Sequence, residues 1–152
     1  MREIENIADL YGLVGQEIGV SEWVLIDQER VDKFAEATGD HQWIHVDVER
    51  ARKEMPTGST IAHGYLTLSL LPMLTSQIMQ IRNVSSRINY GCNRVRFTSM
   101  VKTGSRVRAR QVLKALEPYK NNGVQVVNEV TIEIEGEDRP ACKAETISII
   151  YP

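Results

Sequence analysis

The sequence predicts an α+β fold, in which an antiparallel sheet wraps around one long buried helix. Residues 62–81 begin with turns that are apolar on nearly every side, and a helix with that profile is buried. From about residue 87 onward, polar and apolar side chains alternate instead, which is the period of a half-buried strand. A sheet with one apolar face has to cover that face, and residues 62–81 form the only helical segment long enough to do so.

The first helical signal covers residues 28–38, where apolar side chains recur at spacings of three and four. Asp27 precedes this pattern as an N-cap, and Gly39 follows it as a stop signal. These residues predict a short amphipathic helix.

Residues 40–60 show no sustained periodicity, apart from a short helical pattern near residues 48–54. Long ordered segments of this kind inside a compact domain tend to be functional. The helix predicted over residues 62–81 follows. We expect Pro72 to kink or interrupt it, because proline removes a helical hydrogen bond and clashes with the preceding turn.

Three segments in the second half of the chain alternate in the manner of strands, namely residues 104–117, 124–135 and 141–151. The turn sequence Asn-Asn-Gly at residues 121–123 joins the first two, and such residues favour a tight hairpin. The second half therefore predicts an antiparallel meander.

Two interpretations are open for five arginines of the second half, namely Arg94, Arg96, Arg106, Arg108 and Arg110. Clustered guanidinium groups can bind phosphate, such as that of the nucleotide moiety of a substrate. In the predicted hairpin, however, Arg106 and Arg108, or Arg110, face Glu133 and Glu135 on the next strand. Opposite charges paired across strands stabilise an exposed sheet face, and we favour this second interpretation.

Composition limits the classes of function. The chain has 152 residues, of which 42% are hydrophobic and 25% charged, and this predicts one soluble globular domain over residues 1–152. With 18 basic and 20 acidic residues, the net charge of −2 argues against a nucleic-acid partner. Residues 1–15 do not read as a signal peptide, and we expect no membrane-spanning segment. Cys92 and Cys142 fit no disulfide or metal pattern, which indicates reduced thiols in the cytoplasm.

All three histidines fall within residues 41–63. Among them, His45 follows Asp40 by five residues, on a stretch that can fold back on itself. A carboxylate beside an imidazole can position a water, take its proton and return a proton elsewhere. The simpler alternative is that Asp40 caps a turn and His45 bonds to the backbone, and spacing alone favours it.

A metal site is a further alternative. His41 and His45 are four residues apart, with Asp40 and Asp47 as carboxylate ligands. That histidine spacing requires a helix, which the upstream glycine and the intervening Trp-Ile pair disfavour, and no third ligand is clear. We therefore expect no metal.

The start of the 62–81 helix is a candidate oxyanion site. The first turn of a helix has unpaired N–H groups, and Gly64 lets another molecule approach that backbone closely. A thioester or carboxylate oxygen can be held there. Alternatively, Gly64 only relieves crowding between helix and sheet, and the neighbouring His63 is a cap residue without a chemical role.

Three segments carry a resemblance to a known family: residues 34–47 (FAEATGDHQWIHVD), 61–72 (IAHGYLTLSLLP) and 88–97 (INYGCNRVRF). The chain resembles the MaoC-like (R)-specific enoyl-CoA hydratases of hotdog fold, in particular the small single-domain branch with nodulation protein N. The family motif is Asp-x-Asn-Pro-x-His. Here Asp40 and His45 occupy its acid and base positions, while glutamine and tryptophan replace the central Asn-Pro.

The resemblance implies a hotdog fold with an extra N-terminal helical region and a reversible hydratase activity. Asp40 and His45 would add one water to a trans-2-enoyl thioester, giving the (3R)-3-hydroxyacyl thioester. Which of the two is base and which is acid stays open. The N–H of Gly64 would hold the thioester oxygen, and Gln42 and Tyr65 would contact the substrate. The resemblance also implies a homodimer, a CoA or acyl-carrier substrate, and no metal or redox cofactor.

Two other functions remain as alternatives. A hotdog thioesterase usually places a carboxylate on or near the central helix, and residues 62–81 contain no Asp or Glu. A non-catalytic acyl-CoA-binding protein would not need both Asp40 and His45. Both observations favour the hydratase.

Overall fold

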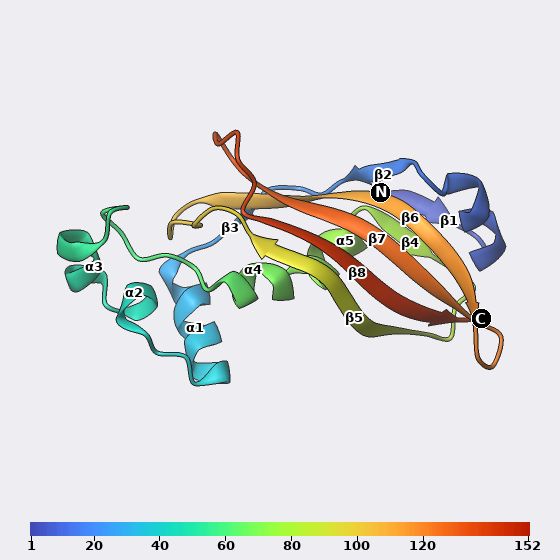
Figure 1. Cartoon of the computed structure of the whole chain (residues 1–152), viewed down its shortest axis with the longest axis horizontal. Helices are drawn as coiled ribbons and strands as arrows, with labels where there is room; N and C mark the ends of the chain where they lie inside the picture. The colour runs from blue at the N-terminus through green and yellow to red at the C-terminus, as the bar shows by residue number, and fades with distance from the viewer.

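The computed structural model describes all of residues 1–152, and its main element is a curved antiparallel sheet (Figure 1). In spatial order the sheet contains β2 (Glu17–Val20), β6 (Arg106–Tyr119), β7 (Gly123–Ile134), β8 (Cys142–Tyr151) and β5 (Ser86–Phe97), and the short β3 (Val24–Leu25) also pairs with β6. This confirms the meander predicted for the second half of the chain.

The β6–β7 hairpin has the predicted turn and the predicted charge pairs. Asn121 and Asn122 have φ angles of 56° and 59°, in the left-handed region that asparagine tolerates. Across the two strands, Arg108 Nε and Arg110 Nε donate to the two oxygens of Glu133, at 2.6 and 2.8 Å. A third ion pair joins residues 106 and 135 at 3.3 Å. The three strand arginines thus lie on a charge-paired sheet face, as favoured above.

The central helix lies against the concave face of the sheet in two pieces (Figure 1). These are α4 (Gly64–Ser69) and α5 (Leu71–Ser76), with Leu70 between them. Pro72 stands in the first turn of α5, where its missing N–H costs no helical bond. The predicted interruption is confirmed.

The prediction of a helix over residues 62–81 is wrong at both ends. The helix begins at Gly64, and beyond Ser76 the chain turns into a strand, β4 (Met79–Ile81). This strand pairs in parallel with β1 (Arg2–Ile4) at the other end of the chain. A short apolar run cannot be assigned to strand or helix by periodicity alone, because its partner lies elsewhere in the sequence.

One side of the central helix forms the core, and the other side is open. Buried leucines of the helix pack with inward-facing residues of β6, β7 and β8, among them Leu66, Leu71, Leu74, Leu113, Val126, Val130 and Ile132. On the opposite side, Tyr65 is 69% exposed and Met73 is 38% exposed. The expectation of burial on nearly every side is therefore wrong for this face.

Three helices precede the central helix and lie beyond one end of the sheet (Figure 1). They are α1 (Gln28–Thr38), α2 (Trp43–Val46) and α3 (Val48–Glu54). The N–H of Arg30 donates to Asp27 Oδ1 at 2.9 Å, and Gly39 ends α1 with a φ of 79°. The predicted helix and both its boundary residues are confirmed.

The N-terminal region adds a 3-10 helix, η1 (Ile7–Leu13), whose Ile7 and Leu10 are buried. None of the helices is both long and apolar enough to cross a lipid bilayer.

Candidate active site

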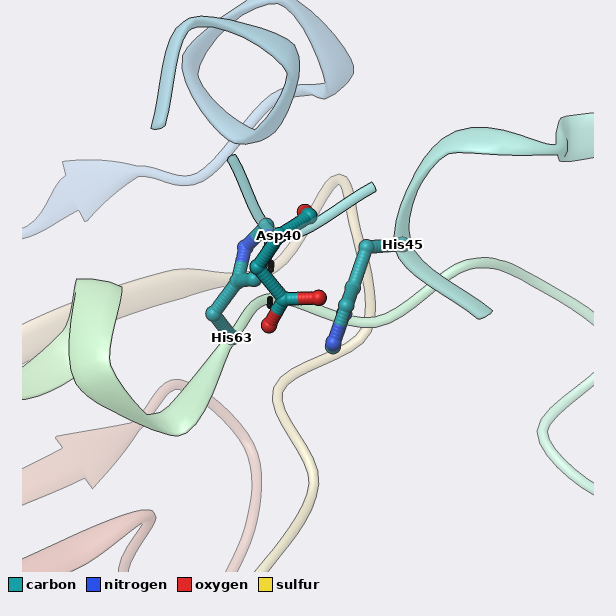
Figure 2. Close-up of side chains that lie close together, drawn as sticks. All are labelled: Asp40, His45 and His63. Atoms are coloured by element: carbon teal, nitrogen blue, oxygen red, sulfur yellow. Dashed lines mark hydrogen bonds and ion pairs between the residues drawn. The ribbon is translucent and has the colours of Figure 1, made fainter. Parts of the chain in front are cut away.

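Three side chains from separate parts of the chain meet near the N-terminal end of α4 (Figure 2). Asp40 follows the end of α1, His45 lies in α2, and His63 directly precedes α4. One carboxylate oxygen and one nitrogen from each ring lie within 4.8 Å of one another. The fold thus brings Asp40 and His45 together, and it adds His63.

His45 is held in place at both its backbone and its ring. The amide Nε2 of Gln28 donates to the His45 carbonyl oxygen at 2.7 Å, and the hydroxyl of Thr60 donates to the same amide's Oε1 at 2.6 Å. On the ring, Nδ1 bonds to the carbonyl oxygen of Ile61 at 2.7 Å. Gln28 and Thr60 carried no signal in the sequence, because their role depends on the packing of α1 against α2.

The contact with Ile61 fixes the protonation of the His45 ring. A carbonyl oxygen only accepts hydrogen bonds, so Nδ1 carries the proton and Nε2 keeps a free lone pair. The side chain is only 6% exposed. This burial lowers the pKa of His45 below its ordinary value of 6.5, against the opposing effect of the Ile61 hydrogen bond. At neutral pH, His45 is therefore a neutral base.

Asp40 is the more open member of the pair, with 52% of its side chain exposed. Its Oδ1 accepts a hydrogen bond from the N–H of Gln42 at 3.3 Å. A water that bonds to two groups at about 2.8 Å each holds them roughly 4.5 Å apart. The carboxylate and the His45 ring, which lie next to each other in Figure 2, can therefore share one water.

His63 contacts both members of the pair. Its ring stacks on that of His45, with centroids 3.8 Å apart and planes at 23°. Its Nε2 donates to the backbone carbonyl of Asp40 at 3.0 Å. The side chain is 3% exposed, and its Nδ1 is buried without a hydrogen-bond partner. Sequence reasoning left His63 as a cap residue, but the structure makes it the link between the other two.

The three residues also offer the donor types of a metal site. His63 Nε2, however, is already bonded to the carbonyl of Asp40, and a metal at this nitrogen would break that contact. The ligand set considered from the sequence does not assemble. His41 lies 3.8 Å from Glu36 on the surface, and Asp47 accepts a backbone N–H as the N-cap of α3.

Gly64 shares a hollow of about 330 Å³ with His45 and Phe97. No backbone acceptor faces its N–H or those of the next two residues. A Cβ at position 64 would lie 2.7 Å from the ring of Phe97, so only glycine fits while that ring stays in place. The crowding between helix and sheet that was one interpretation of Gly64 is therefore present. The unpaired N–H groups that the oxyanion interpretation requires are present too.

Gln42 and Tyr65, the other two predicted substrate contacts, do not bond to the pair through their side chains. Gln42 is exposed and meets Asp40 only through its N–H. Tyr65 lies on the open face of α4, with its ring edge-on to Phe97 at a centroid distance of 5.7 Å.

Comparison with known proteins identifies the family. The MaoC like domain matches residues 10–134 of the chain. The protein belongs to the MaoC-like dehydratase family. Two relatives match this MaoC-like enzyme over nearly their full length. The 3-hydroxyacyl-thioester dehydratase Z of Mycobacterium tuberculosis is 52% identical, over 97% of both chains. Nodulation protein N of Rhizobium leguminosarum bv. viciae is 51% identical, over 95% of this chain and 91% of its own.

The fold agrees with this assignment. The solved (R)-hydratase from A. caviae, involved in PHA biosynthesis, superposes with a TM-score of 0.71 at 23% identity, over 89% of this chain and 94% of its own. The family resemblance and the hotdog fold predicted from the sequence are both confirmed, and the chain is an enzyme of the hydratase–dehydratase class.

Proposed function

We propose that this MaoC-like enzyme is an (R)-specific enoyl-CoA hydratase, which adds water reversibly to a trans-2-enoyl thioester and yields the (3R)-3-hydroxyacyl thioester. The observation that carries the proposal is the pairing of the Asp40 carboxylate with the neutral ring of His45, within 4.8 Å. The relative named 3-hydroxyacyl-thioester dehydratase Z supports the same substrate class. The thioester can be a CoA ester or an acyl-carrier ester.

In this mechanism one water bridges Asp40 and His45. Nε2 of His45 takes a proton from the water as its oxygen bonds to C3 of the enoyl chain, and the resulting imidazolium returns a proton to C2. Asp40 accepts a hydrogen bond from the second O–H of the water, which stays on the oxygen, and it stabilises the positive ring. Atoms balance, because the hydroxyl and one hydrogen of the water end on neighbouring carbons. Dehydration runs the same steps backward.

The carbonyl oxygen of the thioester gains negative charge while C3 is attacked. The unpaired N–H of Gly64, on the hollow that His45 also lines, would donate to that oxygen. Tyr65 and Gln42, at the rim of the site, would contact the substrate. His63 would position the pair, since it stacks on one ring and bonds to the backbone of the other residue.

We further propose a homodimer that forms through β5. This strand closes one end of the sheet, and its outer edge has no partner strand. On this strand the exposed fraction is 52% for Ile88, 58% for Tyr90 and 44% for Phe97. An exposed edge with apolar side chains favours pairing with a second copy, and two-fold dimers are the commonest oligomers. One domain over residues 1–152 and a cytoplasmic location complete the proposal.

Hydration of crotonyl-CoA tests the activity. The absorbance of the enoyl thioester should fall, and chiral analysis should find the (3R) product. No loss of absorbance with any chain length, in a folded protein, would contradict the proposal. A thioesterase would instead release free CoA thiol, which a thiol reagent detects in the same sample. A non-catalytic protein would bind the ester without either signal.

A further inference from the structure

A second cavity, of about 580 Å³, lies further along the central helix, between that helix and the strands β5, β7 and β8. Leu68 and Thr75 line its helix side. They follow Gly64 by four and eleven residues, or roughly 6 and 16 Å at the helical rise. The far end of an acyl chain whose thioester lies at Gly64 would therefore reach this cavity.

Polar side chains line the sheet side of the cavity, although a face that covers a helix is normally apolar. Asn128 interrupts the buried valines of β7. The strand register sets Thr146 beside Asn128, and it sets Asn89 beside Ser148. All four border the cavity and form a polar row across three strands.

Asn128 of this row is paired with a buried glutamine behind it, Gln111, and each of the two amides keeps one group without a partner in the protein. Gln111 and Asn128 are each 1% exposed. Gln111 Nε2 donates to Asn128 Oδ1 at 2.9 Å, while Gln111 Oε1 has no partner and Asn128 Nδ2 donates to no protein atom. Turning both amides over would exchange the unpaired donor and acceptor without removing them. Gln111 does not line the cavity but Asn128 does, so the Asn128 Nδ2 group is available to a polar ligand there.

Arg87 is the one charged residue that lines the cavity. It lies on β5, next to Ile150 of β8, and is exposed in the single chain. Partial desolvation lowers the pKa of Arg87, and no carboxylate neighbour offsets this effect. The guanidinium still keeps its proton in water near neutral pH. The cavity thus holds one unpaired positive charge and no negative charge.

We propose that the acyl chain of the physiological substrate ends in a carboxylate, which Arg87 and Asn128 bind in this cavity. This inference rests on the proposed hydratase function. A guanidinium matches a carboxylate in geometry and charge, and the Asn128 amide supplies a further donor. A plain alkyl end would leave the buried Asn128 amide without a partner, which is unfavourable for binding.

Kinetics with two substrates tests the inference. Hydration of trans-2-hexadecenoyl-CoA, whose chain is long enough to span from Gly64 to the far end of the cavity at Thr75, is compared with hydration of its ω-carboxyl counterpart. The unaltered protein should favour the ω-carboxyl ester by about tenfold or more in kcat/KM, the factor that one charge-assisted hydrogen bond supplies. Arg87→Met should lose this preference, and Arg87→Lys should keep part of it. Arg96→Met is the matched control, because Arg96 lies on the same strand outside the cavity and bonds to its neighbour's carbonyl.

Binding of the two saturated esters, measured by calorimetry, needs no turnover and separates the inference from the proposed activity. Tighter binding of the ω-carboxyl ester, lost in Arg87→Met, supports the site even if no hydration occurs. Equal or weaker binding of that ester overturns the inference, and hydration of both esters would then leave the hydratase proposal standing. If Arg87→Met weakens the binding of both esters equally, Arg87 does not recognise the carboxylate and the inference is wrong. If the substitution lowers the mass of the assembly, Arg87 is a subunit contact, and the inference is wrong as well.

Discussion

A double-mutant cycle on Asp40 and His45 tests whether the two residues act on one water. Asp40→Asn keeps the size of the side chain and a hydrogen-bonding oxygen but removes the charge. His45→Gln replaces the imidazole by an amide, which cannot take up a proton at neutral pH. If both groups hold the water between them, either change alone should remove the acid–base step.

The distance of at most 4.8 Å between the two groups sets the expected magnitude. Positioned acid–base groups typically contribute about 10²–10⁴-fold each. Independent groups would multiply, so the double mutant would lose about 10⁴–10⁸-fold. Groups that share one water act as a unit, and the double mutant should then be little slower than either single one. The resulting coupling free energy is about 3–5 kcal/mol, at 1.36 kcal/mol for each factor of ten.

The assay is the initial rate of crotonyl-CoA hydration, with thermal unfolding measured on each variant. Asp40→Asn should change stability by less than about 0.5 kcal/mol, because its side chain is 52% exposed. His45→Gln should lower it by about 1–3 kcal/mol, because the buried bond to Ile61 is lost. His41→Gln is the matched control, since His41 lies outside the cluster, and its rate should not change. Multiplying effects, or near-normal turnover in either single variant, would refute the shared water and restore the capping interpretation.

Four further outcomes are expected. His63→Phe keeps a flat ring against His45 but loses the bond to the Asp40 carbonyl, so kcat should fall about tenfold with little change in KM, and a change in KM alone would argue against positioning. Since the pKa of His45 is lowered, the neutral base persists through neutral pH, and kcat/KM should decline only on acidification below pH 6.5; a decline that begins above 6.5 contradicts this. Gly64→Val should lower turnover by about 10²-fold or more, and a loss under about fivefold speaks against an oxyanion role. Ile88→Lys on the edge strand should shift the mass measured by light scattering from two chains to one, and an unchanged dimer mass would show that β5 is not the interface.

The sequence was informative where structure depends on neighbouring residues. The helix at 28–38 and the hairpin turn at 121–123 follow from caps and turn residues, and both were predicted correctly. The strand at Met79–Ile81 was missed, because its partner strand lies at the start of the chain and periodicity does not report such pairing. The predicted helix was extended across it for this reason.

The same distinction applies to the site. Asp40 and His45 could be predicted as a pair, because their spacing matches a family motif. The position of His63 against both could not, since it depends on how α4 meets the segment after α1. The polar row of the second cavity could have been predicted in part. Asn128 occupies a position of β7 where the alternation predicts an apolar residue.

Because α1, α2 and α3 lie beyond one end of the sheet, mutations can alter the rate of this enzyme and its preference for acyl chains separately. The groups proposed for chemistry come from this helical segment and the start of α4, whereas the groups proposed to select the acyl end come from β5, β7 and β8 (Figure 1). Substitutions at sites that share no contacts are usually additive in free energy. Mutation of the strand residues that line the second cavity can therefore alter which acyl chain is accepted while the residues proposed for catalysis are preserved. Exchange of residues 27–60 between relatives can alter the rate while chain preference is kept, so the two properties can be engineered in separate libraries and then combined.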